Sequence, residues 1–219
     1  MNYTLSKFAH ELRNPLTTLY STIQLIELQH PEVKGFKYWS ELTVDIEYMN
    51  RLLEEFSDFS KSERLNISTF SMRNLLEEVS LSFAASIAHS KVEYTSKISP
   101  SIYQITGDKT KLQEVFLNLL KNAFEACVPD KTIYLEATTH ENTLTVLIRD
   151  TGCGISAEQL PHIFEPFITY KKQGTGLGLA ICQSIINAHG GSITVDSIVG
   201  HGSTFSVSLP IKGCTENHK

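Results

Sequence analysis

The N-terminal part of the chain places apolar side chains at helical spacing. One series advances in steps of three and four residues, as one face of a helix does: Leu5, Phe8, Leu12, Leu16, Leu19, Ile23 and Ile26. A second series has the same spacing: Trp39, Leu42, Ile46, Met49, Leu53 and Phe56. Residues 30–35 between them contain Pro31 and Gly35, which interrupt helices. The pattern predicts two long amphipathic helices in an antiparallel hairpin.

One hairpin cannot cover the apolar faces of both helices. Two hairpins packed together form a four-helix bundle that buries these faces. We therefore expect the chain to be a homodimer.

After residue 66 the pattern changes to a mixture of strands and helices. Helices are predicted over residues 71–88, 108–127 and 177–189, and strands over 92–98, 132–137, 143–150, 192–196 and 203–209. Asp108 is a favourable N-cap residue for the second of these helices. We expect two domains, an α-helical hairpin (1–66) followed by an α+β two-layer sandwich (67–219).

Composition narrows the class of protein. The 219 residues carry a formal net charge of -5 and show no basic tail, which argues against a general nucleic-acid binder. There is no apolar run near 18 residues and no signal peptide, so we expect no membrane segment and a cytoplasmic location.

The cysteines and histidines form no metal-binding motif. The four cysteines make no CxxC pair and are expected to be reduced thiols, with Cys127 and Cys182 in the core. The eight histidines make no HExxH or Cys/His set, so no structural metal site is expected.

The first candidate for chemistry is His10 on the first predicted helix. It lies off the apolar face, and a neutral imidazole is a good nucleophile near neutral pH. Glu11 could accept the proton of the other ring nitrogen, Asn14 lies one turn further on the same face, and Pro15 should bend the helix. The alternative is an exposed histidine beside an ordinary acid.

A further candidate is the polar face of the helix over residues 108–127. Glu114, Asn118 and Asn122 follow one another at intervals of four, so their oxygens share one face. Oxygen ligands suit Mg²⁺ bridging phosphates, whereas the alternative is an ordinary solvated face.

Two glycine-containing motifs complete the set. Asp150-Thr151-Gly152-Cys153-Gly154 follows a strand; the carboxylate could accept a hydrogen bond from an exocyclic amine such as that of adenine. The run from Gly174 to Leu179 precedes a helix, where free backbone N–H groups can bind phosphate, and Lys171 and Lys172 could meet its charge. The alternatives are a plain turn and a surface loop, and the run is neither a Walker A nor a Rossmann motif.

The order of these motifs is more specific than any one of them. HELRNPL, NLLKNA, DTGCG, FEPF, GTGLGL and GHGST resemble the H, N, G1, F, G2 and G3 boxes of sensor histidine kinases, over roughly residues 5–210. The N-terminal hairpin is similar to their dimerisation and histidine-phosphotransfer domain. The rest of the chain is similar to the ATP-binding sandwich shared with gyrase, Hsp90 and MutL, the GHKL or Bergerat type. Its short lid resembles that of sporulation and nitrogen-regulatory kinases.

The resemblance implies a role for each matching residue. His10 would accept phosphate from ATP, Glu11 would be its acid/base partner, and Asn14 would stand at the position that assists a phosphatase reaction. Asn122 would bind Mg²⁺, with Asn118 and Glu114 close by, and Asp150, Gly152 and Gly154 would form the adenine site. The phosphates would be bordered by Lys171, Gly174, Thr175, Gly176, Leu177 and Gly178. The partner implied is the receiver domain of a response regulator, supplied by another chain.

The sequence departs from the family pattern at two places. Only nine residues precede His10, so we expect this sequence to lack the usual sensor and membrane segments, through truncation or by nature. Tyr170 stands where relatives often have Thr. Two other functions stay open: an ATPase of the same superfamily with another output, and a scaffold dimer with an inactive nucleotide site.

Overall fold

The computed structural model describes residues 2–101, 104–127, 131–171 and 174–211, with side chains from Glu11 onward. The chain separates into two compact units, Met1–Lys61 with Pro166–Gly178 and Ser62–Glu165 with Leu179–Lys219. The domain boundary at residues 66 and 67 stays a prediction.

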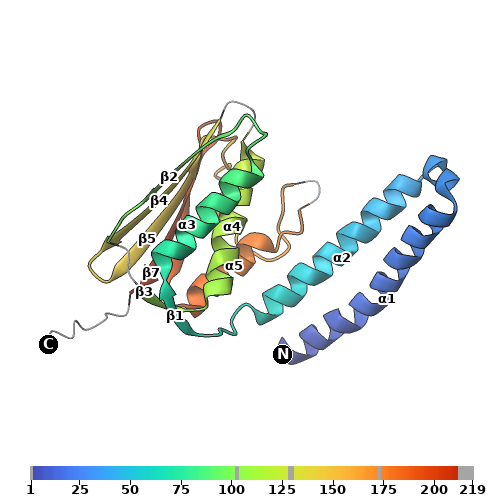
Figure 1. Ribbon diagram of the computed structural model, residues 1–219, viewed down its shortest axis with the longest axis horizontal. Helices are drawn as coiled ribbons and strands as arrows, with labels where there is room; N and C mark the ends of the chain where they lie inside the picture. Colours follow the sequence, from blue (N-terminus) through green and yellow to red (C-terminus); the bar gives the residue numbers. More distant parts are fainter. Residues whose placement is uncertain (1, 102–103, 128–130, 172–173, 212–219) are drawn as a thin grey trace. The chain divides into compact units, whose positions relative to one another are not determined.

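The first unit contains the predicted helical hairpin. Helix α1 (Asn2–Gln29) continues through Pro15, the short 3₁₀ helix η1 (Pro31–Gly35) reverses the chain, and α2 (Trp39–Lys61) runs back along α1 (Figure 1). The predicted hairpin and its break at residues 30–35 are therefore confirmed.

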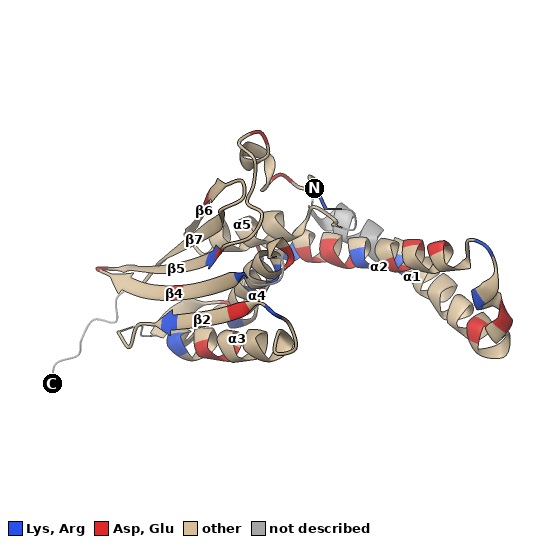
Figure 2. Ribbon diagram, turned by 90° about the horizontal axis from the view of Figure 1, so that it is seen from above, with Lys and Arg blue, Asp and Glu red and all other residues tan. Residues whose placement is uncertain are grey.

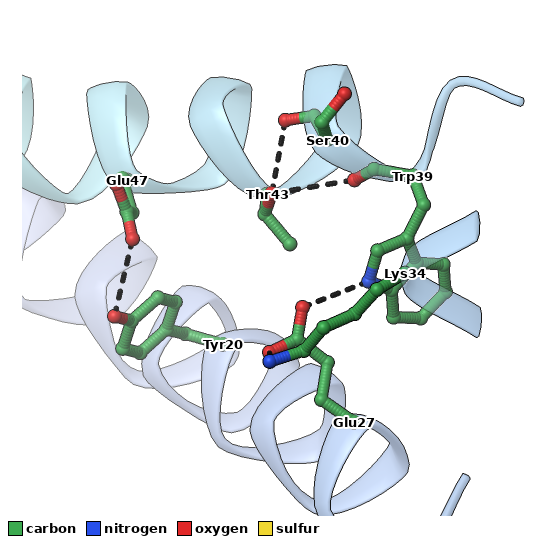
Figure 3. A network of polar contacts seen from close by, with 7 residues as sticks. All are labelled: Tyr20, Glu27, Lys34, Trp39, Ser40, Thr43 and Glu47. Carbon is green, nitrogen blue, oxygen red and sulfur yellow. Dashed lines mark hydrogen bonds and ion pairs between the residues drawn. The ribbon is translucent and has the colours of Figure 1, made fainter. Parts of the chain in front are cut away.

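Polar contacts fix the closed end of the hairpin. The Trp39 indole N–H donates to the Glu27 carboxylate at 2.8 Å, and Lys34 Nζ lies 3.5 Å from the other oxygen of Glu27 (Figure 3). Nearer the middle, the Tyr20 hydroxyl donates to Glu47 at 3.4 Å across the two helices. Together these bonds set the register of α1 against α2.

The hairpin covers only part of its apolar face. Ile23 and Ile46 are buried, at 8% and 5% exposure, whereas Leu12 and Leu19 remain 39% and 51% exposed. All four belong to the helical series predicted from the sequence. A single hairpin therefore leaves apolar surface in water, as the pattern indicated.

The second unit is a two-layer α+β sandwich. Its main sheet has the strand order β2-β4-β5-β7-β6, with β2 (Glu93–Ile98), β4 (Thr132–His140), β5 (Thr143–Asp150), β6 (Ser192–Ile198) and β7 (Gly202–Pro210). Helices α3 (Met72–Ser86), α4 (Lys109–Ala126) and α5 (Gly178–Ala188) lie along one face of this sheet (Figure 1). A short turn of 3₁₀ helix, η2 (Leu160–His162), precedes the segment that leads to α5.

Alternation along the central strands supplies one side of the core. In β5, Leu144, Val146 and Ile148 are buried and alternate with less buried residues. This is the pattern of a sheet with one face turned to a core. On the facing helix α4, Phe116 and Leu120 are fully buried, so helix and sheet enclose a common apolar core.

Asp108 fixes the start of α4. Its carboxylate accepts hydrogen bonds from the Lys111 amide at 3.1 Å, as an N-cap does, and from the Asn66 amide at 2.8 Å. Its own N–H donates to His189 Nε2 at 2.9 Å, while His189 Nδ1 donates to the Ile185 carbonyl. Burial alone would raise the pKa of Asp108, but the two amides and the nearby Lys111 charge together hold it below its usual value.

The structure adds features that the pattern did not predict. Strands β1 (Ser68–Ser71) and β3 (Gln104–Gly107) form a small antiparallel sheet, and β2 runs parallel to β4 although the other pairs are antiparallel. In the part of the chain that the structure describes, no helix combines the length and apolarity needed to span a bilayer.

Candidate functional site

The predicted phospho-acceptor lies on the first long helix. The backbone of His10 is helical within α1, and its side chain is outside the described residues. Glu11 and Asn14 are exposed, and the Asn14 carbonyl accepts a hydrogen bond from the Thr18 hydroxyl at 3.1 Å. The helix therefore presents Glu11 and Asn14 to solvent, next to and one turn from His10.

The amide face of α4, which we define as Glu114, Asn118 and Asn122, is half-buried. It lies near α5, because Asn118 hydrogen-bonds the Cys182 thiol and the Glu114 charge acts on the same group. Burial, the largest cause, raises the pKa of the Cys182 thiol to about 12, so this cysteine is a neutral core residue, as predicted. The amide face thus has a fixed apolar edge along α5.

Asp150 ends β5 and begins the Asp150 turn, which we define as residues 150–155. Its carboxylate is buried at 2% exposure and accepts hydrogen bonds from the Gly152 amide, at 2.8 Å, and the Ser203 amide. Burial, the largest effect, raises the pKa of Asp150 above its usual value, although these bonds oppose the rise. A buried carboxylate held by two amides is a well-positioned acceptor for one further donor.

The Asp150 turn packs directly on the C-terminal end of α4. The Cys153 amide donates to the Ala126 carbonyl at 3.1 Å. A Cβ atom on Gly152 would lie 2.4 Å from the same carbonyl oxygen, so a side chain there would collide with backbone. Since Asn122 is one helical turn before Ala126, this contact brings the amide face and the Asp150 turn to one end of the sandwich.

The other side of the turn lies against the end of β6 and the loop that leads to β7. The Gly200 amide donates to the Cys153 carbonyl at 2.7 Å, and the Ile155 amide donates to the Ser197 hydroxyl at 2.8 Å. Gly154 has φ +70, a left-handed conformation that glycine adopts without strain, and a Cβ there would lie 2.2 Å from the Ile198 carbonyl. The backbone of the turn is therefore hydrogen-bonded on both sides.

The lid segment, which we define as Pro166–Gly178, closes on itself at its base. The Phe167 amide donates to the Gly176 carbonyl at 3.0 Å, and the Gly174 amide donates to the Lys171 carbonyl at 3.2 Å. Lys171 is exposed, Thr175 and Leu177 are buried, and α5 begins at Gly178, as predicted for a glycine run before a helix. Lys172 and its suggested phosphate contact lie outside the described residues.

Two residues of α2 contact the lid segment within the first unit, a role that the sequence did not indicate for either of them. The Thr175 hydroxyl donates to the Glu55 carboxylate. The rings of Phe56 and Phe167 lie with centroids 6.1 Å apart. The helical periodicity of α2 gives no signal for such contacts, because Phe56 fits the apolar series and Glu55 fits a solvated face.

The predicted site residues thus form two groups. The sandwich joins Glu114, Asn118 and Asn122 to the Asp150 turn with Gly152 and Gly154; the first unit contains α1 with His10 and the lid segment. One carboxylate and two amides on α4 supply the oxygen donors that Mg²⁺ prefers, too few to enclose an ion without phosphate oxygens. This donor set therefore fits a metal that is bound together with a nucleotide.

Models of two known protein families match the two halves of the chain. Residues 1–65 match the model of the His Kinase A (phospho-acceptor) domain, and residues 107–213 match that of the histidine kinase-, DNA gyrase B- and HSP90-like ATPase. His10 therefore lies in the first match, and Asn122, Asp150 and the lid segment lie in the second.

Individual proteins give the same result. The chain is 34% identical over 204 residues to the signal transduction histidine-protein kinase AtoS of Escherichia coli, and 35% identical over 208 residues to sporulation kinase A of Bacillus subtilis. Each match covers 93% of this chain but 34% of the relative, so the chain spans about a third of their length.

Solved structures of the histidine kinase ThkA are also similar. Its catalytic domain matches 67% of this chain and 96% of its own length at 30% identity, with a TM-score of 0.61. ThkA in complex with the response regulator protein TrrA matches 96% of this chain and 61% of that chain at 26% identity, with a TM-score of 0.68. With matches to both family models in this order, and to the ThkA catalytic domain over nearly its whole length, the chain belongs to the sensor histidine kinase family.

Proposed function

We propose that this chain is the catalytic core of an ATP-dependent protein histidine kinase that phosphorylates its own His10. The observation that carries the proposal is the contact of the Asp150 turn with the end of α4. It gathers a buried carboxylate and an oxygen-rich helix face in a chain whose first helix contains His10. We propose residues 1–66 as the phosphotransfer domain and 67–219 as the ATP-binding domain.

The reaction transfers the γ-phosphoryl group to an imidazole nitrogen. A nitrogen of His10 attacks the γ-phosphorus, the bond to the β-phosphate oxygen breaks, and ADP leaves. Glu11 accepts the proton of the other ring nitrogen, which keeps the attacking nitrogen unprotonated. The remaining contribution of the protein is to position the groups and neutralise charge.

The sandwich would hold the nucleotide. Asp150 would accept a hydrogen bond from the adenine amine, whereas the phosphates are assigned to Lys171 and the amides of Gly174 to Gly178 in the lid segment of the first unit. Bound Mg²⁺ on Asn122, Asn118 and Glu114 would neutralise phosphate charge. The glycines of the Asp150 turn would shape the adenine site by letting the turn pack closely against the ends of α4 and β6.

Two kinds of protein partner follow. The exposed Leu12 and Leu19 favour a homodimer in which two hairpins form a four-helix bundle. The phosphoryl group of His10 passes to an aspartate of a response regulator, as the complex of ThkA with a response regulator protein suggests. Asn14, exposed one turn from His10, would assist in removing phosphate from that regulator. ATP and this partner make the cytoplasm the expected location.

Radiolabelling with γ-labelled ATP tests the assignment of His10. We expect acid-labile label on the wild type and on the control His30→Gln, an exposed histidine of the same hairpin, and none on His10→Gln. Equal labelling of His10→Gln would contradict the proposal. Acid-stable phosphoserine would support another ATPase output, and failure of the wild type to bind an ATP analogue would support the scaffold alternative.

The charge of Asp150 gives a second test. Because its pKa is raised, the carboxylate becomes protonated at a higher pH than an ordinary aspartate, and the acceptor for the adenine amine is lost. Affinity for an ATP analogue should therefore be full near neutral pH and fall on acidification through this raised pKa. Asp150→Asn should bind at least about tenfold more weakly near neutral pH and lose this pH dependence. An unchanged titration would contradict the role of Asp150.

A further inference from the structure

Cys127 does not occupy the core position predicted for it. Helix α4 ends at Ala126, and Cys127 is its half-buried C-cap residue. Its amide donates to the carbonyls of Ala123 and Phe124, at 3.2 and 3.1 Å, which fixes its backbone. The sequence pattern was wrong here because it counted an apolar residue one position beyond the last helical turn.

A second cysteine lies next to this helix end. Cys153, in the Asp150 turn, is exposed, and its amide donates to the carbonyl of Ala126, the residue before Cys127. Only the Cα–N bond of Cys153, this hydrogen bond and the Ala126–Cys127 peptide separate the two Cα atoms, so they lie within roughly 7 Å. Disulfides commonly join Cα atoms about 4.4–6.8 Å apart.

The electrostatic surroundings of Cys127 agree with the proximity that the backbone shows. Burial, the largest cause, raises the pKa of the Cys127 thiol, and the charges of Asp150 and Cys153 raise it further. Cys127 is thus a protonated thiol near both the adenine-site carboxylate and the exposed Cys153. The third described cysteine, Cys182, is fully buried between α4 and α5 and offers an internal comparison.

We propose that Cys127 and Cys153 form a dithiol site that a hydroperoxide oxidises to a reversible disulfide beside the nucleotide site. The sulfur of Cys153 attacks the peroxide, the O–O bond breaks, and the thiol proton passes to the departing oxygen, so the products are a sulfenic acid and an alcohol or water. The Cys127 thiol then attacks the sulfenic sulfur, an S–S bond forms, and water leaves. Both cysteines are oxidised, and one hydroperoxide is reduced.

The crosslink would change the nucleotide site because of where its two ends lie. Cys153 is three residues from Asp150, and Cys127 is five residues from Asn122 on the adjoining helix end. A disulfide would bind the Asp150 turn covalently to α4 and restrict its adjustment to an adenine ring. We expect about tenfold weaker binding of an ATP analogue, within the usual range of coupling between sites. This second part depends on the proposed function, whereas formation of the disulfide does not.

The test uses the full chain with Cys214→Ser, so that this cysteine cannot form competing disulfides. The protein is treated with hydrogen peroxide, and non-reduced peptides are mapped by mass spectrometry. We expect a Cys127–Cys153 linked peptide that dithiothreitol removes, that Cys127→Ser or Cys153→Ser abolishes, and that Cys182→Ala retains. Oxidation of Cys153 to higher acids without a linked peptide would overturn the proposal.

Nucleotide binding is measured on the same samples. The dissociation constant of an ATP analogue should rise about tenfold in the oxidised protein and return to its initial value after reduction. In either single Ser variant, peroxide treatment should leave the dissociation constant unchanged. An unchanged constant in fully crosslinked protein would overturn control of the site. A reduced protein that binds no nucleotide would contradict the proposed function instead, and the peptide map would remain interpretable.

Discussion

The helical hairpin and the α+β sandwich differ in how far each buries its own apolar surface. In the sandwich, residues such as Phe116, Leu120 and Leu144 are fully buried within the unit. In the hairpin, Leu12, Leu19 and other members of the predicted apolar series stay exposed. The sandwich therefore has the means to fold alone, whereas the proposed pairing with a second hairpin would complete the burial of the hairpin.

The same substitution in the two units should give the largest contrast. Leu120→Ala leaves a cavity in the sandwich core and should lower its free energy of unfolding by about 2–5 kcal/mol. Leu19→Ala should leave the sandwich within about 0.5 kcal/mol of the wild type and weaken the proposed dimer instead. Urea unfolding followed by circular dichroism, together with sedimentation, separates the two effects. Equal destabilisation by both variants would remove the distinction between the units.

The single tryptophan makes this measurement specific to one unit. Trp39 lies in the hairpin, so its fluorescence reports unfolding there rather than in the sandwich. The fluorescence transition should move with Leu19→Ala and depend on protein concentration, and it should stay in place with Leu120→Ala.

Alanine substitution of one glycine in each unit should have a smaller effect on stability. Gly152→Ala puts a methyl group against the Ala126 carbonyl and should destabilise the sandwich by about 1–3 kcal/mol. At Gly35, in the hairpin turn, a Cβ has no atom within 4 Å, so Gly35→Ala should change stability by less than about 1 kcal/mol. Thermal unfolding of both variants checks this, and a stable Gly152→Ala protein would show that the turn can move away from α4.

The N-cap of α4 tests the stability of the sandwich through pH. Asp108→Ala should cost about 1–2 kcal/mol near neutral pH, whereas Asp108→Asn keeps a capping oxygen and should lose less. Because the folded-state pKa of Asp108 is lowered, its contribution is present above the unfolded value and is lost as pH falls through the folded value. The gap between wild type and Asp108→Ala should therefore close only in strong acid; a gap independent of pH would contradict the ionised cap.

The smallest effect is expected at the closed end of the hairpin. Glu27→Gln weakens the bonds to Trp39 and Lys34 and should cost about 0.5–1 kcal/mol in the hairpin alone. The emission of Trp39 should change, while the unfolding of the sandwich should not. An exposed control is Glu32→Gln, whose partner His30 is also exposed.

Much of this architecture could be predicted from the sequence, because periodicity reports burial directly. The steps of three and four residues in α1 and α2, and the alternation in β5, follow from which faces are covered. Strand β1 was missed because Ser68-Thr69-Phe70-Ser71 contains a single apolar residue, and its partner β3 is equally short. The extension of β4 to His140 was missed because Thr138 and Thr139 carry no clear alternation.

The candidate site also contains features that the sequence predicted and features that it did not. Asp150 and Gly152 were recognisable because their motif has a fixed order. The hydrogen bond from the Cys153 amide to the Ala126 carbonyl could not be predicted, because a backbone acceptor has no side-chain signature. Glu55 was missed for a related reason: a contact with residues far along the chain leaves no trace in helical periodicity. The placement of Cys127 failed because the end of α4 is decided by tertiary packing.

The strand order of the main sheet leaves β2 and β6 as edge strands, which affects how the protein behaves at high concentration. A sheet that ends in open strands can recruit a strand from a neighbouring molecule and grow into aggregates. The two outermost strands here carry Glu93 and Lys97 on β2 and Asp196 on β6, charges that discourage such growth. Figure 2 shows acidic groups repeated along α2 as well, so charge accompanies the exposed leucines of the hairpin. At high local concentration, this protein should therefore associate through the hairpin into assemblies with a defined number of chains, and it should not form open-ended fibres through the sheet.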